Sequence, residues 1–363
     1  MSENSTAKKP GKIKSFLIKK NIIVSGKRYF IDAMGAMANG LFASLLVGTI
    51  VSTLGQRLGV QVLMDIGDFA KGVAGPAMAV SIAYALQAPP LVLFSLLAVG
   101  SAANSIGKAG GPLAVFVIAI IATELGKLVS KETKVDILVT PLVTICSGVL
   151  LSIKFAPYIR DVASSVGNLI MWATELHPFL MGIVVSVVVG MILTLPISSA
   201  AICAALSLTG LAGGAAVAGC CAQMVGFAFM SYRENKVGGL VSQGLGTSML
   251  QMGNIVRNPR VWIPPTLAAA ITGPIATCVF KLRMDGEAIA SGMGTCGLVG
   301  QIGVYSGWIN SIAEGTKTAI TAFDWTGLVL ISLVLPAILS VVFCLILRKI
   351  GWIKENDLKL DNM

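Results

Sequence analysis

The chain has 363 residues, of which 55% are hydrophobic and 12% are charged, and its formal net charge is +10. Ordinary soluble domains carry roughly a quarter charged residues, so this composition excludes a soluble globular protein and indicates an all-α, polytopic integral membrane protein. The positive charge is concentrated before the first apolar segment, which favours a membrane surface over nucleic acid as its partner.

Residues 1–30 form a basic N-terminal segment in which lysines alternate with apolar residues such as Phe16 and Ile22. This pattern predicts an interfacial helix on anionic lipid and, by the positive-inside rule, a cytoplasmic N-terminus. A cleaved signal peptide is the alternative. It is disfavoured because the apolar run that follows is long enough to span a bilayer and has no small-residue cleavage site.

Apolar segments long enough to approach a bilayer crossing follow one another along most of the chain. We predict about ten spans, at residues 35–55, 72–87, 89–104, 110–128, 136–153, 178–195, 197–212, 213–231, 261–281 and 325–347. Residues 154–177 show helical spacing with one polar face, which predicts an amphipathic helix lying on the membrane.

Two uncharged segments, 237–256 and 288–313, are too rich in Gly, Ser, Thr, Gln and Asn for lipid-facing helices. Irregular backbone at membrane depth is tolerated where it is buried in protein or lines a cavity. We therefore predict that both segments are re-entrant and belong to a transport path.

An internal repeat links KETKVDILVT, from Lys131, with RENKVGGLVS, from Arg233. It predicts a first membrane repeat at 31–176, a second at 177–350, and a cytoplasmic tail at 351–363. Basic residues in both runs place both loops in the cytoplasm, which makes the repeat parallel on this span count. One miscounted span would make it inverted.

A shorter similarity links the two polar segments, because both contain Gly, Leu or Met, Gly, Thr. We call residues 244–247 the first GxGT segment and residues 292–295 the second. Glycines let a ligand approach the backbone, and the threonines add hydroxyls, although close helix packing would also explain the glycines. The predicted ligand-facing residues of the two segments are Gly244, Gly246, Thr247, Gly292, Gly294 and Thr295.

Further uncharged polar residues lie in or beside apolar segments and suit a sugar-like ligand, whose hydroxyls need many hydrogen-bond partners. The remaining candidate substrate-binding residues are Ser198, Ser199, Gln243, Gln251, Asn254 and Gln301. Hydrogen bonding between helices is the competing explanation for each, and we favour it for Gln223.

Two titratable residues are candidates for a proton or coupling role, because ionisable groups inside a membrane are costly. Glu124 lies within a predicted span, and His177, the sole histidine, precedes one. For both residues an interfacial structural role is the alternative. No catalytic motif, metal site or cofactor site is predicted, and the cysteines fit buried packing positions.

Several runs in the chain closely resemble the IIC proteins of the bacterial phosphotransferase system, in the group that includes the perfringolysin O regulator. They include APPLVLFSLLAVG, HPFLMGIVVSVVVGMILTLPISSAAI, GCCAQMVGFAFMSYRENKVGGLVSQGLGTSMLQ and WIPPTLAAAITGPIAT, and the resemblance covers about residues 30 to 350. It implies a sugar-permease component in the bacterial inner membrane, a homodimer, and separate IIA and IIB proteins for any phosphoryl transfer.

Two departures limit what the resemblance implies. The Gly-Ile-Thr-Glu-Pro-like motif of glucose-type IIC proteins is absent, so their sugar-binding residues cannot be carried over. No IIB cysteine motif or IIA domain is expected within the chain. The leading hypothesis is a permease for a small polar, sugar-like solute. A membrane sensor or regulator that binds a ligand without moving it, and an ion-coupled secondary transporter, are the alternatives.

Overall fold

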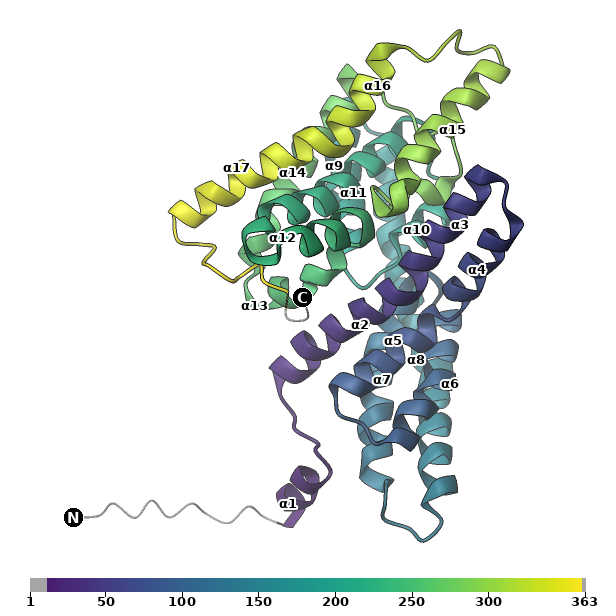
Figure 1. The fold of residues 1–363 in the computed structure, drawn as a ribbon, viewed down its shortest axis with the longest axis vertical. Coiled ribbons are helices and arrows are strands. Elements are labelled where there is room, and N and C mark those ends of the chain that lie inside the picture. Colours follow the sequence, from purple (N-terminus) through teal and green to yellow (C-terminus); the bar gives the residue numbers. More distant parts are fainter. Residues whose placement is uncertain (1–11, 361–363) are drawn as a thin grey trace, which may run out of the picture.

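The computed structural model describes residues 12–360, and every regular element among them is a helix or a helical turn (Figure 1). Lys8 and Lys9, predicted to lie in the interfacial segment, and the last three residues of the tail fall outside the described residues. The short helix α1, Lys12–Lys19, begins the described chain.

The first membrane element is a helix that is continuous over Lys27–Gln56 and contains α2, Ala33–Leu41, and most of α3, Val47–Leu58. The chain reverses at Gly59, whose φ of 68° is in the left-handed region, and returns as α4, Gln61–Gly72, and α5, Ala74–Ala85. Glycines at 40, 48 and 67 leave no room for a Cβ against the returning helices, so small residues allow the close approach.

Three antiparallel helices follow: α6, Pro90–Gly107; α7, Gly111–Val129; and α8, Asp136–Thr174. The turn between α6 and α7 is made at Lys108, where φ is 46°, and it brings Val92 against Gly126. Helix α8 has 39 residues, which corresponds to about 58 Å at 1.5 Å per residue. It therefore contains the predicted span 136–153 and most of the segment 154–177, predicted as a surface helix, in one continuous helix.

The second half is built around α11, Gly210–Met230, of which nearly all residues are buried. Helix α9, Pro178–Thr194, runs parallel to α11, because Gly190 contacts Gly219 and Thr194 contacts Gln223 further along both helices. Helix α14, Ile263–Pro274, runs antiparallel to both, and α16, Ala322–Val329, and α17, Leu335–Lys349, complete this half.

Shorter elements connect these helices. They are α10, Ser199–Ala205; α12, Tyr232–Val241; α13, Met252–Arg257; and α15, Val299–Ala313. Residues 242–251 contain a π-helical turn, the extended residue Thr247 and a 3-10 turn. Residues 288–298 contain two 3-10 turns joined by turn residues. In Figure 1, α12 and α13 lie beside the C-terminal end of the chain, and α15 lies at the other side of the second half.

The expectation of an all-α, multi-pass membrane protein is confirmed, whereas the count of ten spans is not. Among residues 12–360, six helices are long and apolar enough to cross a membrane, and Ala74–Ala85 and Pro178–Thr194 are shorter apolar helices. Residues 197–212, predicted as one span, contain α10 with only seven residues, because Gly210 starts a new helix. The two similar runs lie in different elements: the first leads into the long α8, which begins at Asp136, whereas the second lies almost wholly within the short α12.

Candidate functional site

The two GxGT segments meet in the interior of the second half. The hydroxyl of Thr295 donates a hydrogen bond to the backbone carbonyl of Gly244, and Thr295 is fully buried. Its hydroxyl also lies 3.6 Å from the sulfur of Met224, on the central helix α11. The similarity between the two segments in sequence therefore corresponds to direct contact in space.

A third turn joins them, at residues 196–199 between α9 and α10, and we call it the serine turn. Ser199 donates from its hydroxyl to the carbonyl of Gly292 at 2.7 Å. Ser198 begins α10, because its side-chain oxygen accepts from the backbone N–H of Ala201 at 3.2 Å. Both serines are thus held by backbone groups rather than by lipid or solvent.

The serine turn and the GxGT segments contribute to the lining of a small cavity of about 60 Å³, which we call the central cavity. Its polar lining consists of Ser198, Ser199, Gly246 and Thr247. The rest of the lining is mostly apolar and comes mainly from the first membrane helix, the end of α9 and the second GxGT segment: Leu41, Leu45, Leu46, Leu193 and Met293. A few polar groups in an apolar cavity between helices are typical of a small-molecule site.

The glycines of the two segments serve close backbone packing. A Cβ added at Gly246 would lie 2.2 Å from the ring of Phe42, and one at Gly292 would lie 2.6 Å from the Ser199 carbonyl. Gly294 has a φ of +53°, and a Cβ there would meet Cys220 at 2.7 Å. Gly244 is the least crowded, with its nearest atom at 3.5 Å. The packing explanation considered from the sequence therefore applies to three of the four glycines.

The predicted amide residues lie outside this cavity. Gln243, Gln251 and Asn254 are buried and hydrogen-bonded to one another, in two bonds of 2.8 Å. Gln301 donates to the sulfur of Cys221 at 3.2 Å, while its carbonyl oxygen is buried without a hydrogen-bond partner in the described chain. The structure thus separates the predicted substrate-binding set into cavity-lining residues and residues of other polar clusters.

The two titratable candidates lie in different surroundings. Glu124 forms an ion pair of 2.9 Å with Lys127, whose side chain is 1% exposed, and accepts a hydrogen bond of 3.1 Å from Tyr29. His177 is an exposed residue that begins α9. Neither residue lines the central cavity.

The family of the chain is decided by comparison with known proteins. A family model described as "Phosphotransferase system, EIIC" matches residues 31–360. The chain belongs to the EIIC family of the phosphotransferase system. This confirms the resemblance found in the sequence and, together with the apolar helices, makes the protein a multi-pass membrane permease component of that system. No curated protein and no solved structure matches the chain.

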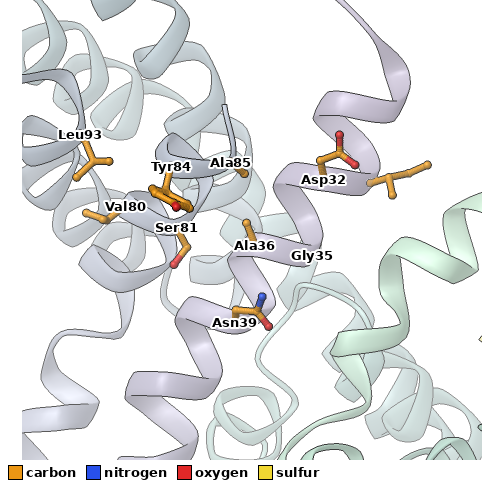
Figure 2. A pocket seen from close by; sticks show the side chains of 10 residues that line it. Asp32, Gly35, Ala36, Asn39, Val80, Ser81, Tyr84, Ala85 and Leu93 are labelled. Carbon is orange, nitrogen blue, oxygen red and sulfur yellow. The ribbon is translucent and has the colours of Figure 1, made fainter. Parts of the chain in front are cut away.

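This EIIC protein also has a larger groove, of about 660 Å³, between α2, α5 and the start of α6 (Figure 2). The polar groups of the groove come from two helices. Asp32, just before α2, and Asn39, within α2, lie on one side, and Ser81 and Tyr84 of α5 lie on the other. The groove opens on the surface, and Tyr84 is 76% exposed. Its lining comes from residues 31–39 and 80–93 alone, whereas the smaller cavity brings together the first membrane helix, the serine turn and both GxGT segments.

The sequence reasoning missed Asp32 because the first span was placed at 35–55. The helix actually starts at Lys27, so this carboxylate lies inside the first membrane element. A signal was present, since Asp32, Gly35, Ala36 and Asn39 have the spacing of one helix face.

Proposed function

We propose that this EIIC protein moves a small polar, sugar-like solute, and that the solute binds where the serine turn and the two GxGT segments meet. The cavity they share is the observation that carries this proposal, because polar groups from separate parts of the chain line one common space. Such a site, formed by interrupted helices in the membrane interior, is a common plan among transporters.

The hydroxyls in the cavity are prepared to donate. Ser198 accepts from the N–H of Ala201, and Thr247 accepts from the N–H of Met249 at 3.1 Å. A hydroxyl that accepts one bond from the backbone retains its own proton for a second partner. Ser198 and Thr247 are therefore the residues we propose as donors to solute hydroxyls.

The small size of the cavity supports a mechanism in which the segments that line it move apart. Its volume of about 60 Å³ is far below the roughly 300–1,000 Å³ of ordinary ligand pockets. A space of this size is too small to hold a sugar. Solute binding requires the serine turn and the GxGT segments to separate, and we propose that both GxGT segments are re-entrant and move with the second half of the chain.

The topology, partners and oligomeric state of the transporter are proposed from its family membership and from the positive-inside rule. We expect both termini in the cytoplasm of a bacterial cell, IIA and IIB proteins as phosphoryl-transfer partners, and a homodimer. The sensor and ion-coupled alternatives have no supporting contact of their own. In particular, Glu124 already has Lys127 as its ionic partner.

The proposal is tested by measuring solute binding to the purified protein. A panel of hexoses, hexitols and disaccharides is screened by thermal shift, because a ligand that binds the folded state raises its melting temperature. Ser198→Ala and Thr247→Val should each weaken affinity for the stabilising sugar about two- to twelve-fold, the effect of losing one hydrogen bond. Ser164→Ala, on an exposed part of α8, is the control. Unchanged affinity in both cavity variants would place the site elsewhere.

A further inference from the structure

The C-terminal segment 351–360 folds back onto the second half and is held through its backbone. Asn235 donates from its amide to the carbonyl of Leu358 at 2.8 Å, and its oxygen accepts from the N–H of Leu360 at 2.9 Å. Such a reciprocal pair satisfies both backbone groups as a neighbouring strand would. Leu358 itself is fully buried.

The same segment is also bound by the amide cluster described above. Gln251 donates to the carbonyl of Leu358 at 3.0 Å, and Asn254 donates to the carbonyl of Lys359 at 2.9 Å. Gln251 also donates to Gln243, which directly precedes the first GxGT segment. An uninterrupted series of buried hydrogen bonds therefore leads from the C-terminal segment to the residue that precedes the first GxGT segment.

Apolar and ring contacts fix the rest of the segment. Ile353 and Leu358 belong to the same buried cluster as Met249 and Met252, which flank Gln251. At its start, the guanidinium of Arg260 lies 5.1 Å from the ring centre of Trp352. The segment is thus packed along its length rather than attached at one point.

We propose that residues 351–360 act as a strap that positions the first GxGT segment, and that Gln251 and Asn254 are positioning residues for the site rather than ligands of the solute. Residues 242–251 consist of short π-helical and 3-10 turns, which have few hydrogen bonds of their own to keep them in place. Fully satisfied buried amide networks rigidify the backbone they join. The consequence for transport rests on the proposed function, whereas the ordering of 242–251 by the strap does not.

Hydrogen–deuterium exchange of the purified full chain tests the strap without any solute. Leu358→Ser removes a fully buried anchor. Lys359→Ser changes an exposed side chain, and the hydrogen bonds of this residue are made by its backbone N–H and carbonyl. We expect amide exchange in residues 242–251 to rise about tenfold in Leu358→Ser and to stay at the parent rate in Lys359→Ser. Asn235→Ala should give the same rise, and it decides the result if Leu358→Ser fails to fold.

The outcomes separate the strap from the proposed site. Faster exchange confined to 351–360, with 242–251 unchanged in both strap variants, would overturn the inference. Faster exchange in 242–251, together with weaker binding of the stabilising sugar in Asn235→Ala, supports it fully. If exchange rises but Ser198→Ala and Thr247→Val leave sugar binding unchanged, the strap stands and the proposed solute site fails.

Discussion

Thr295 and Gly244 are joined by a hydrogen bond from the threonine hydroxyl to the glycine carbonyl, in the buried interior of the second half. This bond is the direct link between the two GxGT segments. Ser199 adds a similar link from the serine turn to Gly292. The proposed opening of the central cavity would separate these segments and would therefore have to break such bonds.

Thr295→Val tests this link. Valine keeps nearly the volume of threonine but leaves the Gly244 carbonyl without its donor, so we expect a loss of about 0.5–1.5 kcal/mol in the free energy of unfolding. Thermal and denaturant unfolding in detergent measure it. Thr123→Val is a suitable control, because the Thr123 hydroxyl is buried without a hydrogen-bond partner in the described chain. Equal losses in the two variants would show that the Gly244 bond adds nothing.

Gly294→Ala should be strongly destabilising. An L-residue in the left-handed region costs roughly 1–2 kcal/mol, and the new Cβ would overlap Cys220. Gly253→Ala is the matched control, because Gly253 lies within α13 with its nearest neighbour at 3.5 Å, and alanine is the better helix former. We expect Gly294→Ala to melt well below the parent and Gly253→Ala to melt at or above it.

Glu124 and Lys127 should behave as a structural pair. Removing one partner of a buried ion pair leaves an uncompensated charge, which costs about 3–5 kcal/mol. Glu124→Gln should therefore lower the melting temperature, and the double variant Glu124→Gln with Lys127→Met should recover part of the loss. A Glu124→Gln protein as stable as the parent but unable to accumulate solute would instead indicate a proton-coupling role.

Cysteine labelling in whole cells can establish the topology. In a background with the exposed Cys146 and Cys278 replaced by serine, Thr133→Cys and Arg233→Cys should both be protected from an impermeant reagent added outside. Both loops lie on the side of the molecule where the first membrane helix begins. In the first loop, Glu132 pairs with Lys20, shortly before that helix. Near the second loop, the C-terminal strap is bonded to α13, which contacts residues 27–32. Labelling of one site from outside would show that the two loops face opposite sides.

The class of the protein and part of the site were predictable from the sequence because both depend on local patterns. Apolar composition requires a membrane environment, and the repeated GxGT run marked two segments that contact each other. The hydrogen-bond partners of Gln251 and Asn254 were not predictable in this way. Their partners are Leu358 and Lys359, more than 100 residues away in the chain, and no local pattern reports such a contact.

Residues 154–177 likewise make contacts that their periodicity does not report. A polar face predicts a helix lying on a surface when the segment is considered alone. In the structure, Ala163 and Ile170 of that segment are buried, and Ile170 packs among residues of α9 and α10. Packing against the second half therefore continues α8 beyond the predicted end of the span, which periodicity alone does not reveal.

The length of α8 has a mechanical consequence. Its first part packs on α6 and α7, and its last part packs on α9 and α10, so a single rod connects the two halves of the molecule. At about 58 Å, it is nearly twice the roughly 30 Å thickness of a hydrocarbon core. Pro157, between these two parts, lacks the N–H that would bond to the carbonyl of Ile153, which makes it the natural bending point. If one half rotated against the other, α8 would therefore bend at Pro157.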